Sequence, residues 1–422
     1  MKGKWFLLFS ILCLFSVVPS PTLRAQNTGF VYVGNHQNGQ SDSILGYAIT
    51  DNNGALTPVP GSPFPTQFGN SNIKFAVTPS GRFLYTPSAI PGNNGVNGYA
   101  IDANSGSLTP IPGSPFFAET ADIGPGWLVM DPLGRFLYAV DGYYGQIFVY
   151  SIDQNTGALT QQSNSPFYIQ YAYPNYFGLD ATGQYAYSTS YQPFRSNAPD
   201  GAISVYKIDQ ATGSFALVPG SPFLVPRDPS AANKYFPPSP SWAVTDASSR
   251  FLYVTDSAQL DLWTFAIDGV SGALTLSPTS PMHMPHGANQ FTIDPSGSFA
   301  YFTTLYPNST DCANYFPYSN VYAPDSVFVY SIDQASGALS PSSSPMVAAG
   351  YQPSPLATDP SGRFIYILNL QGYNFDPNSS TISAYRSRGI GGPVTEVLGS
   401  PFAAGAKASP FSLVVAAPQK KN

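Results

Sequence analysis

A repeated unit of roughly fifty residues constrains this chain more than any other feature. The tripeptide Ser-Pro-Phe or Ser-Pro-Met recurs at intervals of 51 to 64 residues. Its serine stands at positions 62, 114, 165, 221, 280, 344 and 400. A period of this length indicates one supersecondary unit per copy, and such a unit buries its apolar face only by stacking on its neighbours. We therefore expect a repeat architecture.

Two further signatures divide each unit into strands. The segment Ile-Thr-Asp-Asn-Asn-Gly-Ala-Leu-Thr at 49–57 has counterparts that start at Ile101, Ile152, Ile208, Ile267 and Ile332. The segment Pro-Ser-Gly-Arg-Phe-Leu-Tyr at 79–85 recurs from Pro132 and Pro360, and in looser form from Ala181, Ala247 and Pro295. Both contain a tight turn whose glycine supplies a positive φ between two short apolar runs. Each unit is thus predicted to hold four antiparallel strands, A to D.

Four-stranded units of this length are typical of β-propeller blades. Six complete units begin near Asn72, Gly126, Tyr176, Ser241, Ala288 and Ser354. The chain ends supply a seventh, because Phe30 starts a B strand with no A strand before it and 409–416 forms an A strand with nothing after it. We predict an all-β, seven-bladed propeller closed by one C-terminal and three N-terminal strands. An open solenoid of the same sheets would need capping units instead of complementary ends.

The first 25 residues are predicted to be a secretory signal peptide. Lys2 and Lys4 precede an apolar run from Trp5 to Val18, and Leu23-Arg24-Ala25 forms a cleavage site. An apolar run of about 14 residues is short for a bilayer-spanning helix. We expect cleavage near Ala25, a secreted or periplasmic protein without a membrane span, and one propeller domain over 26–422.

The charge and the cysteine content exclude several classes of function. The net charge of −6 becomes −9 once the three basic residues of the signal peptide are removed. Nucleic acids and acidic membrane surfaces need a basic patch, so neither is an expected partner. Only Cys312 remains after cleavage, which rules out an internal disulfide and leaves its role open. We expect a monomer without a cofactor.

The loops B–C and D–A, which share one face of a propeller, hold most of the length variation and many aromatic residues. Binding residues usually lie on such loops. The predicted ligand-binding residues are Tyr191, Tyr235, Tyr315, Tyr318 and Tyr373. Tyrosines in weakly charged loops favour stacking on sugar rings or contact with a protein. The alternative is that the loops fold over one another and bury their own aromatic side chains.

Few side chains are suited to catalysis. His286 precedes an A strand near the channel mouth and is a candidate acid or base. Arg195 and Arg227 could hold an anionic group, although pairing with Asp200 or Asp228 is an alternative. His283 and His286 could share a metal, but no carboxylate pair accompanies them, so we predict no metal site.

The repeats Asp131-Pro-Leu-Gly-Arg-Phe-Leu-Tyr and Val149-Tyr-Ser-Ile-Asp-Gln-Asn-Thr-Gly-Ala-Leu-Thr resemble the seven-bladed lactonase family, which includes 6-phosphogluconolactonases and muconate-lactonising enzymes. Arg250-Phe-Leu-Tyr-Val-Thr-Asp is similar to the Tyr-Val-Thr-Asn repeats of related surface propellers. Family enzymes show Gly-Pro-Arg-His at one A strand and Asn-Glu after a B strand. Here Pro285-His286 keeps the histidine without the arginine, and Tyr301-Phe-Thr-Thr lacks Asn-Glu.

Two functions follow as hypotheses. The first is an exported lactonase-type propeller that binds a carbohydrate or a protein through its aromatic loop face. The alternative is an active lactone hydrolase with His286 as base, a carboxylic ester hydrolase of the 6-phosphogluconolactonase kind.

Overall fold

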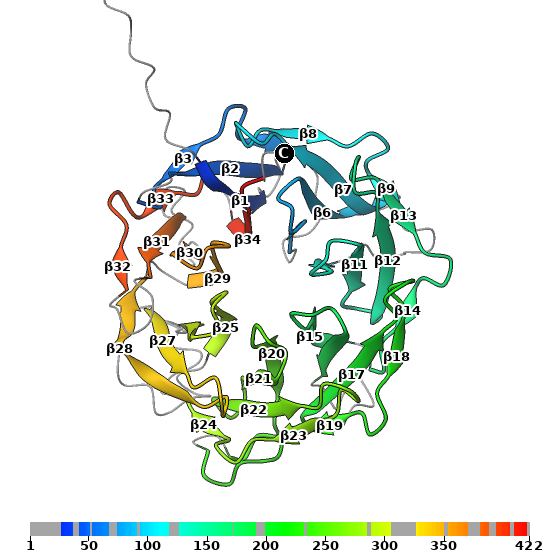
Figure 1. Cartoon of the computed structure of the whole chain (residues 1–422), viewed down its shortest axis with the longest axis vertical. Helices are drawn as coiled ribbons and strands as arrows, with labels where there is room; N and C mark the ends of the chain where they lie inside the picture. The colour runs from blue at the N-terminus through cyan, green and yellow to red at the C-terminus, as the bar shows by residue number, and fades with distance from the viewer. Residues whose placement is uncertain are drawn as a thin grey trace, which may run out of the picture.

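The computed structural model contains seven antiparallel sheets and, among the described residues, no helix. It describes residues 27–36, 42–50, 53–66, 74–90, 93–117, 126–171, 173–190, 199–231, 234–284, 288–304, 326–349, 353–369, 380–387, 394–405 and 409–419. The sheets stand around a central channel as the blades of a propeller (Figure 1). Within these ranges, no segment forms a helix with the length and apolar character to cross a bilayer.

We number the blades from the N-terminus. Blade 1 holds β1 (Asn27–His36), β2 (Ser43–Thr50), β3 (Leu56–Pro58), β4 (Phe64–Pro65) and β34 (Ser409–Ala416). Blade 2 holds β5 (Ala76–Val77), β6 (Phe83–Ile90), β7 (Asn93–Ile101), β8 (Leu108–Pro110) and β9 (Phe116–Phe117). Blade 3 holds β10 (Trp127–Met130), β11 (Phe136–Asp141), β12 (Gln146–Ile152), β13 (Leu159–Gln161) and β14 (Phe167–Tyr168). Blade 4 holds β15 (Pro174–Leu179), β16 (Tyr185–Ser190), β17 (Ala202–Ile208), β18 (Phe215–Leu217) and β19 (Phe223–Leu224).

The remaining blades follow the same order. Blade 5 holds β20 (Pro240–Thr245), β21 (Phe251–Asp256), β22 (Asp261–Ile267), β23 (Leu274–Leu276) and β24 (Met282–His283). Blade 6 holds β25 (Ala288–Ile293), β26 (Phe299–Thr304), β27 (Ser326–Ile332) and β28 (Leu339–Ala348). Blade 7 holds β29 (Pro353–Thr358), β30 (Phe364–Asn369), β31 (Thr381–Arg386), β32 (Thr395–Glu396) and β33 (Phe402–Ala403).

The predicted closure of the ring is confirmed. The C-terminal strand β34 pairs antiparallel with β1, from Phe30 opposite Ala416 to His36 opposite Ser409. This pairing removes two exposed sheet edges that would otherwise be open to association. The C-terminal residues also reach blade 2, where the Gln419 side chain donates to the carbonyl oxygens of Gly81 and Ile101 at 3.2 and 2.8 Å.

The D strands are broken in two, a detail that the sequence did not predict. In six blades a three-residue or two-residue strand is followed by a separate two-residue strand, with the Ser-Pro dipeptide between them. Proline cannot donate to a ladder. The serine supplies a bond across this break, since the backbone N–H of Gly98 donates to Ser114 Oγ at 2.9 Å and that of Val149 donates to Ser165 Oγ at 2.9 Å.

The other two signatures join neighbouring blades. The glycine of a C–D turn lies against the first aromatic residue of the B strand in the preceding blade. A Cβ on Gly106 of blade 2 would thus approach the ring of Phe30 in blade 1 to 2.4 Å. The tyrosine two residues further on donates across the same junction, from Tyr32 Oη to the Gly106 carbonyl at 2.7 Å. Apolar clusters fill the space between adjacent blades, for example that of Val33, Ile49, Phe364 and Ile382 between blades 7 and 1.

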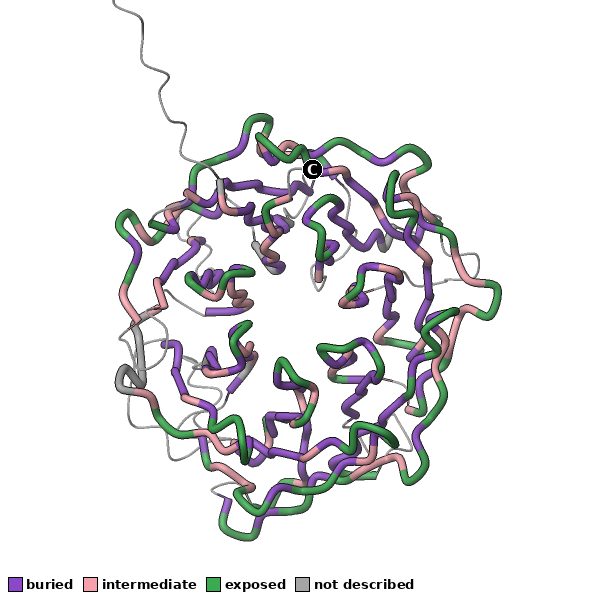
Figure 2. Tube along the Cα trace, viewed as in Figure 1, coloured by how far each residue is buried: buried purple, intermediate pink, exposed green. Residues whose placement is uncertain are grey.

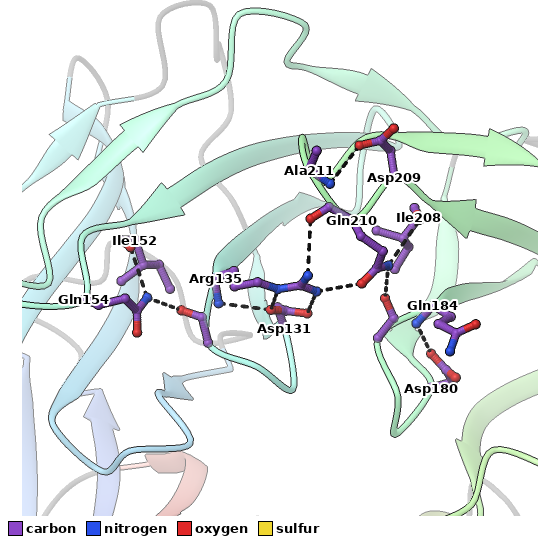
Figure 3. Close-up of polar contacts among 12 residues, drawn as sticks. Asp131, Arg135, Ile152, Gln154, Asp180, Gln184, Ile208, Asp209, Gln210 and Ala211 are labelled. Carbon is purple, nitrogen blue, oxygen red and sulfur yellow. Dashed lines mark hydrogen bonds and ion pairs between the residues drawn. The ribbon is translucent and has the colours of Figure 1, made fainter.

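The arginine of the A–B turn adds a polar link. Arg135 forms a two-pronged ion pair with Asp131 of its own turn and donates to the Gln210 side chain of blade 4 at 2.9 Å (Figure 3). Gln210 in turn donates to the Gly183 carbonyl at 2.8 Å. The repeated residues therefore make the contacts that join neighbouring blades. The strands are mostly buried, and exposed residues lie at turns around the outer edge and beside the channel (Figure 2).

Candidate functional site

The central channel contains a cavity of about 420 Å³ at the A strands. One position is shared by all seven A strands. In blades 2 to 7 it lies four residues before the first residue of the A–B turn, which is Thr78 in blade 2 and Asp131 in blade 3. It is occupied there by Lys74, Trp127, Tyr176, Trp242, Gln290 and Pro355, and in blade 1 by Ser412, which pairs with Gly34 of β1; all seven residues line the cavity. A strands run from the D–A loops toward the A–B turns, so this ring of residues lies toward the face that carries the D–A and B–C loops. We call that face the loop face.

Lys74 contributes a cation to an aromatic part of this ring. Its ammonium nitrogen lies 3.8 Å from the centroid of the Trp242 ring and 5.7 Å from that of Trp127. Tyr176 packs on Trp242 with centroids 4.9 Å apart, and Trp242 Nε1 donates to the Phe291 carbonyl at 3.1 Å. The indole and phenol rings are thus held in place around the amine.

The protonation of Lys74 depends on two opposing effects. Burial lowers the pKa of the Lys74 amine to about 7. The neighbouring indole rings favour the charged form by roughly 0.5–2 kcal/mol. The amine can therefore serve near neutral pH as a cation for an anionic group or as a proton acceptor.

A second group of aromatic side chains lies at the end of blade 3 that meets the loop face. Tyr143 contacts Tyr144 and Tyr173 edge to face, with centroids 4.9 and 5.0 Å apart. Tyr143 and Tyr144 are 47% and 45% exposed, which leaves their faces available to a ligand. The turn that carries them packs on the channel lining, because a Cβ on Gly142 would approach the Trp127 ring to 2.6 Å.

Only two of the predicted site residues fall within the described ranges. Arg227 lies 3.9 Å from Asp200, and both side chains are about half exposed, so the alternative ion pair is present in a loose form. Tyr235 is 85% exposed and is not buried by other loops. The others, His286, Arg195, Tyr191, Tyr315, Tyr318 and Tyr373, lie outside the described residues, as do the predicted signal peptide and Cys312.

The expectation that no carboxylate pair accompanies the histidines is wrong for His283. Asp228 and Asp261 come within reach of its ring, with Asp261 Oδ1 2.8 Å and Asp228 Oδ2 3.6 Å from His283 Nδ1. Asp261 stands opposite His283 in the β22–β24 ladder, and Asp228 arrives from the D–A loop before blade 5. Asp228 and Asp261 are far from His283 in the sequence; the hairpin register brings Asp261 to the ring, and the D–A loop brings Asp228.

The residues that line the channel were also missed. Lys74, Trp127 and Trp242 come from blades 2, 3 and 5 and share no local motif. A usable signal existed, because each stands four residues before an A–B turn that the repeat identifies. Superposing the repeats on those turns would have placed the three on one ring.

Comparison with known proteins agrees with this architecture. Residues 117–220 match the family model described as Lactonase, 7-bladed beta-propeller. Among curated proteins, a 6-phosphogluconolactonase of Serratia proteamaculans is 27% identical over 40% of this chain and 48% of its own length. One of Pectobacterium carotovorum is 29% identical over 33% of this chain and 39% of its own length. The match thus spans about half or less of these relatives.

Solved structures extend the likeness over most of the chain. A putative 6-phosphogluconolactonase of Bacteroides fragilis has a TM-score of 0.65 at 16% identity and covers 94% of this chain and 99% of its own. The periplasmic gluconolactonase of Pseudomonas aeruginosa has a TM-score of 0.64 at 19% identity and covers 92% of this chain and 99% of its own. At these identities the likeness shows the fold. The predicted resemblance to the seven-bladed lactonase β-propellers is thus confirmed, in sequence over residues 117–220 and in fold over most of the chain.

Proposed function

We propose that this chain is an exported hydrolase of carbohydrate-derived lactones that binds its substrate where the channel opens on the loop face. The observation that carries the proposal is the channel cavity, at whose shared A-strand position one amine lies together with three aromatic rings and the amide of Gln290. A sugar lactone offers an apolar ring face, hydroxyl groups and a carbonyl, and these match aromatic, amide and cationic partners respectively. The matched lactonase family model and the curated 6-phosphogluconolactonases favour the same reaction class.

The reaction requires water, a base and stabilisation of an oxyanion. A base removes a proton from water, the hydroxide attacks the lactone carbonyl carbon, and the ring C–O bond breaks as its oxygen takes up a proton. We assign the base to His286, which lies two positions before β25 and four positions before the channel residue Gln290. Lys74 would stabilise the developing oxyanion and then the product carboxylate. Arg227 would bind an acidic substituent at the rim.

A second candidate is carbohydrate binding without turnover. It is favoured by the exposed tyrosines of blade 3 and by Tyr235, which offer stacking surface outside the channel. Hydrolysis requires the polar residues of the channel, whereas binding through the exposed tyrosines does not.

A lactone panel distinguishes them. Glucono-lactone, its 6-phosphate and an uncharged five-membered lactone would each be incubated with the wild-type chain and with the His286→Ala and Lys74→Met variants. Acid release would be measured against spontaneous hydrolysis. We expect wild-type turnover and a loss of tenfold or more in each variant. Turnover unchanged by His286→Ala would remove its assigned role. Absence of turnover, together with saturable binding of the sugars, would replace hydrolysis by the binding function.

A further inference from the structure

Blade 5 carries a row of ionisable side chains at the loop-face ends of β21, β22 and β24. Asp256 on β21 stands opposite Asp261 on β22, and Asp261 stands opposite His283 on β24. Residues directly opposite in a ladder project from the same face of a sheet. The D–A loop brings Asp228 to this row, and the backbone N–H of Asp228 donates to Gln259 Oε1 at 3.2 Å.

The row contains a group of possible metal ligands. One oxygen of Asp228, one oxygen of Asp261 and one ring nitrogen of His283 lie within 4.8 Å of one another. The ligand atoms around a tetrahedral cation with bonds of about 2.0–2.1 Å are roughly 3.3 Å apart. Small side-chain movements would bring these three atoms to that spacing. Ser230 Oγ donates to Asp228 Oδ1 at 2.7 Å, which orients that carboxylate.

The charges of this row are not balanced by its hydrogen bonds. The side chains of Asp228 and Asp261 are 6% and 1% exposed, and Asp256 is also buried. The Oδ2 atoms of all three carboxylates are buried and receive no hydrogen bond from the described residues. One imidazole, more than half exposed, faces two of these carboxyl groups, those of Asp228 and Asp261. Buried carboxylate oxygens need a donor, a proton or a cation.

We propose that Asp228, Asp261 and His283 bind a divalent cation. An imidazole nitrogen together with two carboxylates favours Zn²⁺ or Mn²⁺ over Ca²⁺ or Mg²⁺, which prefer oxygen ligands alone. The exposed side of His283 leaves the site open to solvent for loading. A bound ion would fasten the D–A loop that carries Asp228 to β22 and β24.

Blade 3 supplies a matched control. There, Gln146 and Tyr168 occupy the positions of Asp261 and His283, opposite each other in the same register. The double variant Asp261→Gln/His283→Tyr therefore installs a pair that this scaffold already accommodates. His283→Gln changes only the exposed ligand and guards against misfolding of the double variant.

The test is metal content after equilibrium dialysis of the chelator-treated full chain against Zn²⁺, Mn²⁺, Ca²⁺ or Mg²⁺ in turn, with a thermal melt of each sample. We expect one equivalent of Zn²⁺ or Mn²⁺ in the wild type and a higher Tm with the metal. We expect that equivalent to be lost in the double variant and its affinity to fall at least tenfold in His283→Gln. Wild-type protein without bound metal, or variants that retain the equivalent, would overturn the proposal. The outcome does not depend on lactone hydrolysis.

Discussion

The B–C turns of blades 3 and 5, both at the loop face, have the same backbone conformation but carry different side chains. Each B–C turn runs from an aspartate, Asp141 or Asp256, and closes with an N–H to carbonyl bond of 3.0 Å, from Gly145 or Leu260. Gly145 and Leu260 adopt φ angles of 67° and 63°. On this common turn, blade 3 displays tyrosines and blade 5 displays carboxylates and a histidine. The signature residues thus specify the blade, and the positions between them are free to carry a site.

The largest expected effect concerns the two turn aspartates. Among the described residues, Asp256 Oδ1 accepts backbone N–H groups from Ser239, Ala258 and Gln259, whereas Asp141 Oδ1 accepts those of Tyr143 and Tyr144. At about 1 kcal/mol per bond, Asp256→Ala should lower the free energy of unfolding by roughly 3 kcal/mol and Asp141→Ala by roughly 2 kcal/mol. Denaturant titrations measure both. An equal or reversed order would show that the turns are not held as described.

A smaller difference in stability is expected between blades 2 and 3 at the face that carries the C–D turns. Tyr85 Oη donates to the Gly157 carbonyl at 2.8 Å, whereas the buried Tyr138 Oη has no partner among the described residues. Tyr85→Phe should cost about 1–2 kcal/mol because it leaves a buried carbonyl unpaired. Tyr138→Phe should be neutral or slightly stabilising. A cost for Tyr138→Phe that matched Tyr85→Phe would contradict this assignment of contacts.

The two blades should also differ in their effect on lactone kinetics. Removal of the exposed rings in Tyr143→Ala/Tyr144→Ala should raise KM about threefold to tenfold with little change in kcat, since stacking contributes roughly 0.5–1.5 kcal/mol. His283→Gln, assayed with metal present, should leave KM within about twofold. If the blade 5 variant raises KM and the blade 3 variant does not, the substrate lies elsewhere on the loop face.

The smallest effect is a pH dependence at Asp141. Burial raises the pKa of its carboxyl, while the N–H groups of Tyr143 and Tyr144 oppose the rise. A raised pKa means that the folded state retains a proton that the unfolded state has released, so stability falls as pH rises from about 4 through the folded-state pKa. Asp141→Asn should lose this dependence. Unfolding titrations between pH 4 and 7 that gave parallel curves for both proteins would contradict it.

The fold was predictable because the residues of its repeated signatures make the contacts between neighbouring blades. Within the described residues, a C–D turn glycine packs on a B-strand aromatic ring at six junctions, as Gly106 does on Phe30. Tyr85 and Tyr366 repeat the hydroxyl bond that Tyr32 makes. The site was not recognised, because its residue types do not recur, although the repeat gives the channel residues a common position. Lys74 and Trp242 are 168 positions apart and meet only once the ring has closed. Asp261 and His283 are 22 positions apart, and their contact follows from a register that broken D strands conceal.

The most direct test of the central claim is the structure of the chain with D-gluconate, the product expected from glucono-lactone. We predict gluconate in the channel, with its carboxylate within hydrogen-bonding distance of Lys74 Nζ and its carbon chain against Trp242 or Trp127. Gluconate that leaves the channel empty and binds elsewhere, or no bound gluconate at saturating concentration, would contradict the proposed site.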